Sequence, residues 1–186
     1  MNFKFNLTLL LILILNPIAK GAENVFLYKG TFSRSIKIEE LYKFKRTKKP
    51  SIKLKNLMKI TNQKEKDLHK ILSLKIEVPL KTSSRLMNSK IGEVFLSRLS
   101  KIIYPNKILN KELSIKAMRS GLLLSSFKNN QKITLIDFFK AYPNKNIAID
   151  LNALSKTLNK AASIKELINF YSDSPFKKLK DGRSSN

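Results

Sequence analysis

The sequence predicts a mainly helical α+β domain behind an N-terminal signal peptide, and three observations lead to this prediction. Apolar residues make up 42% of the 186 residues, which is enough for a packed core. Two short β-rich runs, 24–29 and 31–38, flank Gly30, whereas most of the remaining chain repeats its apolar residues at helical spacing. Neither Cys nor Trp occurs, which excludes disulfides and thiolate metal sites.

Residues 1–21 have the three-part layout of a secretory signal peptide. Lys4 and the α-amine form a short positive region, and a nearly pure Leu and Ile run follows at 7–15. This run is too short to cross a bilayer as a helix, which needs about 20 residues. Ala19 and Gly21 then supply small residues at the spacing that favours cleavage after Gly21. We therefore expect the chain to be exported.

Short strands are expected near both ends of the domain. Gly30 lies between the first two runs, as a tight hairpin requires. The run 146–150, NIAID, also alternates apolar residues with smaller or polar ones. Because a lone hairpin is only marginally stable in water, we expect this third short strand to join it in a small sheet. Arg34 falls on the apolar parity of the hairpin's second strand, so we expect it at the sheet edge.

Helices are expected between these strands, with prolines mainly at their boundaries. The predicted segments are 39–47, 51–60, a helix after 61, 79–87, 90–103, 111–127, 135–142 and 151–171. The residues expected to cap helix N-termini are Thr61, Ser89, Asn110, Thr134 and Asp150. The prediction is one mainly helical domain over 23–172, followed by a basic flexible tail over 173–186.

Two of these helices carry more specific expectations. The residues that recur on one face of helix 90–103 are Ile91, Phe95, Leu99 and Ile102. Helix 111–127 has an apolar face wide enough to be largely buried. Gly121 in its middle costs about 1 kcal/mol relative to Ala unless a neighbouring element packs closely there.

The chain is strongly basic, with 37 Lys and Arg against 13 Asp and Glu and a net charge of +24. Such a field attracts polyanions, although AT-rich codons, which also favour Asn and Ile, account equally well for much of the lysine excess. The densest stretch, 42–59, contains no acid, and Pro50 divides it into two short helical segments. Lys45, Lys48 and Lys49 are expected to share a side, with Lys55 and Lys59 one turn apart. The candidate binding residues are Lys43, Lys45, Arg46, Lys48, Lys49, Lys53, Lys55 and Lys59.

No constellation of catalytic residues is visible in the sequence. His69 is the one histidine, with Glu65 and Ser73 four residues away on either side, and we interpret it as a surface residue of an amphipathic helix. No nucleophile elbow, Walker loop or dinucleotide-binding loop occurs. We therefore expect no catalytic residue, no metal site and no cofactor.

Three blocks together resemble a known family. They are VFLYKGTFSRSIKIEEL at 25–41, SRLMNSKIGEVFLSRLSKII at 84–103 and TLIDFFKAYPNKNIAIDL at 134–151. They look like the cyanobacterial domain of unknown function catalogued as an alpha/beta hydrolase of unknown function. The resemblance implies a domain that follows a signal sequence and precedes a dienelactone-hydrolase-like catalytic domain. It also implies a periplasm or thylakoid lumen as the location. The basic stretch 42–59 adds membrane association as a further expectation.

The sequence departs from that arrangement after residue 172, where only a short basic stretch remains. The domain is therefore expected to stand alone, and none of the three blocks contains a catalytic residue that the family could supply. Enzyme activity stays undecided, and the interpretation leans against it.

The prediction for function is an exported binding or adaptor module with a basic surface for an acidic protein or an anionic membrane surface. One alternative is an esterase-like, hydrolase-related protein, or an accessory domain of a separate hydrolase acting in trans. A second alternative is nucleic-acid binding, which the charge invites. Export and the low share of Arg, with six of the 37 basic residues, argue against nucleic acid.

Overall fold

The computed structural model describes residues 21–108 and 110–160, apart from the side chains at 82 and 158–160. Within them the fold is α+β and mainly α, as the sequence predicts. The helices are α2 (Ile38–Thr47), α3 (Ile52–Thr61), α4 (Glu65–Ser73), α5 (Leu80–Met87), α6 (Lys90–Leu99), α7 (Lys111–Lys128), α8 (Leu135–Ala141) and α9 (Leu151–Lys160). Apart from Gly21, the predicted signal peptide lies outside the described residues, and so does the predicted tail 173–186.

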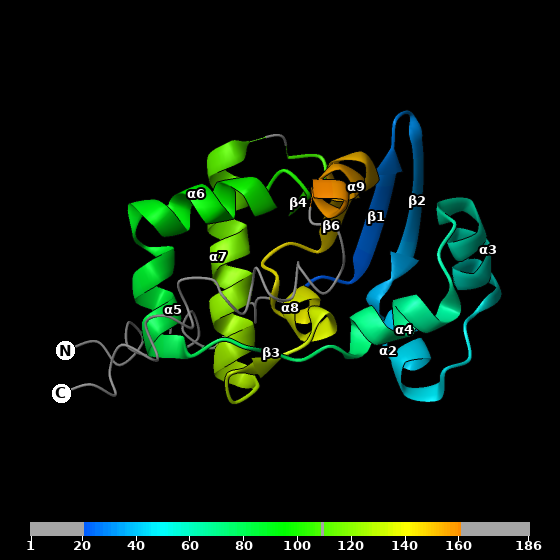
Figure 1. Cartoon of the computed structure of the whole chain (residues 1–186), viewed down its shortest axis with the longest axis horizontal. Coiled ribbons are helices and arrows are strands. Elements are labelled where there is room, and N and C mark those ends of the chain that lie inside the picture. The colour runs from blue at the N-terminus through cyan, green and yellow to red at the C-terminus, as the bar shows by residue number, and fades with distance from the viewer. Residues whose placement is uncertain (1–20, 109, 161–186) are drawn as a thin grey trace, which may run out of the picture.

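A four-stranded sheet crosses the middle of the molecule (Figure 1). Its order is β2-β1-β6-β4, and the strands are β1 (Asn24–Lys29), β2 (Phe32–Lys37), β4 (Ile103–Pro105) and β6 (Asn146–Asp150). Only the β1–β6 pair is parallel, and it brings the two ends of the domain together. Val25 lies opposite Ile36 on one side and Ile147 on the other, and all three are at most 2% exposed. These buried β-branched residues pin the register of the sheet.

The predicted hairpin and third strand are confirmed. Gly30 adopts a φ of 60° at the turn, a left-handed conformation that glycine adopts without steric cost. Arg34 is exposed on β2, the edge strand, as expected, and its guanidinium carbon lies 4.3 Å from the centroid of the Phe32 ring.

Three strands were not predicted. Tyr104-Pro105 does more than end a helix, because it belongs to β4, which pairs with β6. Pro105 is tolerated there because β4 is an edge strand. A second sheet pairs β3 (Ile76–Glu77) with β5 (Lys132–Ile133). Two residues per strand are too few to show any alternation in the sequence.

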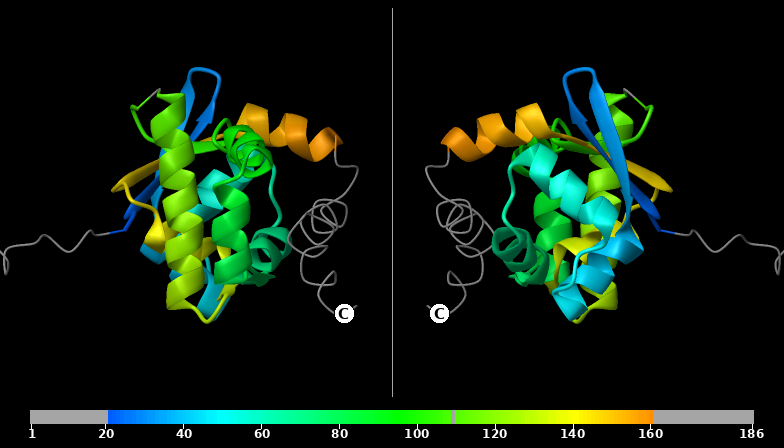
Figure 2. Two further views of the ribbon diagram at one scale, coloured as in Figure 1. Left: turned by 90° about the vertical axis from the view of Figure 1, so that its left-hand side faces the viewer. Right: turned by 90° about the vertical axis from the view of Figure 1, so that its right-hand side faces the viewer.

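The helices form two groups around this sheet (Figures 1 and 2). Helices α5, α6 and α7 pack together on the β4 side, and α2, α4 and α8 pack together nearer the hairpin. Helix α3 packs beside β2 and forms the outer end of the molecule, at the front of the right-hand view of Figure 2. The outer face of α3 therefore points away from the rest of the domain.

Four of the five predicted N-caps are confirmed by hydrogen bonds. Ser89, Asn110 and Thr134 accept bonds from the backbone N–H groups three residues on, and Asp150 accepts from those of 152 and 153. Thr134 and Asp137 also form a reciprocal capping box. The prediction for Thr61 was wrong, because it is the last residue of α3 and its hydroxyl donates to the carbonyl of Leu57.

The predicted faces of two helices were partly wrong. On α6 the buried residues are Gly92 and Leu96, whereas Ile91 is 66% exposed. On α7 the apolar face is less completely buried than predicted, since Phe127 is 70% exposed. Both helices contain more apolar positions than one side can bury, so spacing alone does not determine which side faces inward.

A neighbouring element packs closely against Gly121, which is the condition that the sequence analysis set for a glycine in the middle of this helix. A β-carbon there would lie 2.9 Å from the Phe138 ring and 3.2 Å from the Tyr142 ring. Helix α7 therefore packs directly against the aromatic residues at the end of α8.

Tyr142 is fully buried, and its hydroxyl has no hydrogen-bond partner among the described residues. We expect Tyr142→Phe to leave the free energy of unfolding unchanged or to raise it by about 1 kcal/mol, because it removes an unpaired buried polar group. Tyr28→Phe is the matched control. Its hydroxyl donates to Asn106 Oδ1 at 2.7 Å, so this variant should lose about 1 kcal/mol. Urea denaturation near neutral pH measures both effects.

The same substitution should change alkaline stability. Burial raises the pKa of Tyr142 above its ordinary value of 10.0. Above about pH 10 the unfolded tyrosine ionises while the folded one stays neutral, so stability falls as the pH rises. Tyr142→Phe should lose less stability than the wild type between about pH 9 and 11. An equal loss in both proteins would mean that Tyr142 ionises in the folded state as readily as in the unfolded one.

Candidate basic interaction surface

The predicted binding residues lie on two helices and the corner between them. Lys43, Lys45 and Arg46 are on α2, and Lys53, Lys55 and Lys59 are on α3. Lys48 and Lys49 occupy the connection. Pro50 separates the two helices, as predicted.

Backbone and side-chain bonds fix the corner between α2 and α3. Lys48 has a left-handed φ of 56° and its N–H donates to the carbonyl of Phe44 at 2.8 Å, which closes α2. The hydroxyl of Thr47 accepts the N–H of Lys49 at 3.2 Å. Ser51 caps α3 and donates its hydroxyl to Glu40 on α2 at 2.6 Å. The basic residues of the two helices are therefore held on an ordered framework.

Seven of the eight predicted residues are exposed: Lys43, Arg46, Lys48, Lys49, Lys53, Lys55 and Lys59. None of them forms an ion pair among the described residues, where the three ion pairs involve Lys116, Lys132 and Lys145. We call these seven residues the basic surface. Because these exposed charges have no anionic partner within the described residues, they are available to an external anion.

Lys45 corrects the prediction that it shares a side with Lys48 and Lys49. It is half-buried, and its ammonium donates to the hydroxyl of Thr134 at 3.3 Å. Lys45 therefore links α2 to the start of α8 and is not part of the exposed surface.

One further cation near α2 was missed by the sequence analysis. The ammonium of Lys140, on α8, lies 4.0 Å from the centroid of the Tyr42 ring, and the guanidinium of Arg46 lies 5.7 Å from it. Such contacts are attractive because the ring face is electron-rich. Arg46 follows Tyr42 by four positions, whereas Lys140 follows it by 98. Only tertiary packing therefore reveals that Lys140 contacts the same ring as Arg46.

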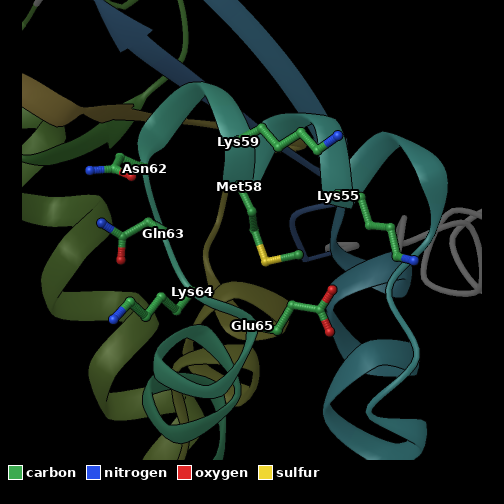
Figure 3. A pocket seen from close by; sticks show the side chains of 7 residues that line it. All are labelled: Lys55, Met58, Lys59, Asn62, Gln63, Lys64 and Glu65. Carbon is green, nitrogen blue, oxygen red and sulfur yellow. The ribbon is translucent and has the colours of Figure 1, made fainter.

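A hollow of about 480 Å³ lies beside the basic surface, where α3 turns into α4 (Figure 3). Its lining residues are Lys55, Met58, Lys59, Asn62, Gln63, Lys64 and Glu65. Figure 3 shows the Met58 side chain extending toward Glu65, while the Lys55 and Lys59 side chains extend outward from α3. Its charged lining is three lysines and one glutamate, so the hollow is net positive and continues the basic surface toward α4.

His69 lies on α4 as predicted but is half-buried, so the prediction of a surface histidine was partly wrong. Its Nε2 lies 3.0 Å from the carbonyl oxygen of Lys45, and its ring meets the Phe44 ring edge-to-face at 6.0 Å. A carbonyl accepts hydrogen bonds, so Nε2 carries the proton in this contact. His69 therefore connects α4 to α2.

A second polar cluster lies on the sheet. Tyr28 donates to Asn106, and burial raises the pKa of Tyr104, with further contributions from Asp150 and Tyr28. The Asp150 carboxylate already accepts two backbone N–H groups as the cap of α9. This cluster is accounted for by sheet and helix contacts.

The described part of the chain contains no group of three or more His, Cys, Asp and Glu side chains that could hold a metal ion. Among its helices, none combines the length and apolar character that a membrane span requires.

The comparisons with known proteins give one match. No curated protein and no solved structure matches the chain. A family model matches residues 21–150, which is well over half of the 186 residues and includes the sheet, the basic surface and His69. The chain therefore belongs to the family described as alpha/beta hydrolase of unknown function.

Proposed function

We propose that this chain is an exported binding module that docks onto a polyanionic surface through the basic surface on α2, α3 and their corner. The observation behind the proposal is that two consecutive helices and their corner carry seven exposed cations, none of them in an ion pair among the described residues. Each Lys or Arg near an anionic membrane contributes about 1 kcal/mol. A few such residues therefore suffice for measurable, salt-sensitive binding.

Two observations support the export part of the proposal. The family match begins at residue 21, where the predicted signal peptide ends. Ala22 is buried, and its N–H donates to the carbonyl of Phe139 at 3.2 Å. Cleavage after Gly21 would leave a new N-terminus held against the end of α8, where the helix dipole favours a positive α-amine.

Polyglutamate binding at low and high salt tests the basic surface. The variant Lys43→Gln/Lys49→Gln/Lys59→Gln removes three exposed charges from it. We expect its affinity to fall by about a hundredfold at low salt, because each of the three cations contributes about 1 kcal/mol. Wild-type binding should also weaken steeply as salt rises.

The matched control is Lys90→Gln/Lys101→Gln/Lys128→Gln, which removes the same net charge from exposed positions elsewhere. It should change the affinity less than about threefold if binding is local. Equal losses in the two variants would show that the overall field, and not this surface, attracts the polyanion.

The family description favours a second candidate, a hydrolase-related protein or an accessory domain for a separate hydrolase. An ester-hydrolysis assay of the wild type and of His69→Ala distinguishes this candidate from a non-catalytic binding module. The bond from His69 to the Lys45 carbonyl supports a structural role for the imidazole, so any hydrolysis should not depend on it.

A further inference from the structure

The outer face of α3 carries two isoleucines that the core does not use. Ile52 is 80% exposed and is the most exposed large apolar residue among those described, and Ile60 is 46% exposed. They lie on one row of the helix with Asn56 between them, because residues four apart are neighbours on a helix surface. We call Ile52, Asn56 and Ile60 the α3 ridge. The opposite face, with Leu54, Leu57 and Met58, is buried in the core.

Unpaired lysines flank the ridge on both sides. Lys55 and Lys59 form the adjacent row, three and seven residues after Ile52. Lys53 lies on the other side, seven residues before Ile60. Lys49 precedes the helix and Lys64 follows it, and both are exposed. Long lysine side chains in such positions can keep their ammonium groups in water while their stems lie along apolar material.

The acids around the ridge are few. Glu40 accepts the Ser51 hydroxyl at the start of α3, and Glu65 lies in the hollow on the Lys55 and Lys59 side. Neither forms an ion pair with a lysine of α3 among the described residues. The ridge thus carries an exposed isoleucine near each end of α3, is flanked by cations, and lies opposite the buried face of the helix.

We infer that the polyanion is an anionic lipid bilayer and that α3 lies on it with Ile52 and Ile60 inserted among the lipids. This inference rests on the proposed function and names the partner of the same surface. A nucleic acid would satisfy the lysines but offers no apolar layer to the two isoleucines, and a soluble acidic protein would need an apolar patch placed among its acids. A bilayer offers anionic headgroups to the lysines and an apolar layer just below them, as interfacial helices require.

The absence of tryptophan in the sequence makes insertion directly measurable. Ile52→Trp introduces one fluorophore on the ridge, and Ile91→Trp introduces one at a comparably exposed position on α6. The chain is used after removal of residues 1–21, with vesicles of phosphatidylcholine alone or with phosphatidylglycerol. We expect a blue shift and quenching by brominated lipid only for Ile52→Trp and only with phosphatidylglycerol. No shift at residue 52, or an equal shift at residue 91, would overturn the inference.

Binding of three further variants separates this inference from the proposed function. Ile52→Ser/Ile60→Ser should lower partitioning into phosphatidylglycerol vesicles about tenfold or more, yet leave polyglutamate binding within about twofold of wild type. Ile91→Ser/Val94→Ser, at exposed positions on α6, should change neither. Vesicle binding that survives in the Ile52/Ile60 variant would overturn lipid insertion while the proposed function stands. If Lys43→Gln/Lys49→Gln/Lys59→Gln binds both probes as the wild type does, the proposed function itself fails.

Discussion

Gly92→Ala should destabilise the domain by about 3–5 kcal/mol, although Gly→Ala inside a helix normally stabilises by about 1 kcal/mol. A β-carbon at Gly92 would lie 1.9 Å from the carbonyl oxygen of Leu86 and 2.7 Å from Cα of Met87. That carbonyl is held by the N–H of Ser89 at 3.0 Å and its hydroxyl at 2.6 Å, so it cannot move aside. The close approach of α6 to the last turn of α5 therefore requires glycine.

Two other glycines provide graded controls for Gly92→Ala. At Gly121 the nearest atoms belong to the Phe138 and Tyr142 rings, which can shift, so Gly121→Ala should cost less. At Gly30 nothing lies within 4 Å, and only the left-handed φ opposes a side chain, at a cost of about 1 kcal/mol. Urea denaturation gives the order, and the soluble yield at low temperature reports any variant that fails to fold. A Gly92→Ala protein as stable as Gly30→Ala would contradict this packing.

Local features of the fold were the most predictable from the sequence. Ser89, Asn110, Thr134 and Asp150 cap helices because each cap depends on a side chain and a backbone N–H within three residues of it. The hairpin at Gly30 is equally local. The prediction that Thr61 caps the next helix was wrong because α3 continues through Thr61 and ends at Asn62, which has a left-handed conformation.

The tertiary pairings were less predictable, for physical reasons. The strand β4 has three residues and is held by β6, more than 40 residues later in the chain. The close contact of Gly92 with α5 fixes which side of α6 faces inward. The spacing of apolar residues along α6 does not show this contact. Ile91 therefore lies outside, although its spacing matches an apolar stripe.

The candidate surface was also predictable in its local features and not in its tertiary contacts. The sequence identifies the lysines of 42–59, but it does not distinguish Lys45, which binds Thr134, from its exposed neighbours. It also does not show that Ile52 and Ile60 are left outside the core while Leu54 and Met58 enter it. Which apolar residues of a basic helix are free for a partner is decided only when the helix packs.

Phe44→Ala should lower the free energy of unfolding by about 3–5 kcal/mol. Phe44 is 1% exposed on the inner face of α2, and α2 packs against α4, α8 and β2. Removing the ring leaves a cavity at the junction of these elements and deletes the edge-to-face contact with His69. Phe44→Leu is the control, because it keeps a large apolar side chain and leaves a much smaller cavity, and it should cost about 1.5 kcal/mol plus the lost aromatic contact.

A double-mutant cycle with His69→Ala isolates the aromatic contact from the cavity. The coupling energy between Phe44 and His69 should be about 0.5–1.5 kcal/mol, the usual range for an aromatic pair. Because the exposed cations lie on the opposite side of α2 and on α3, Phe44→Ala should bind polyglutamate as the wild type does wherever it remains folded. Loss of binding in the folded variant would mean that the basic surface needs the tight packing of α2, and the framework at the corner would then belong to the binding site.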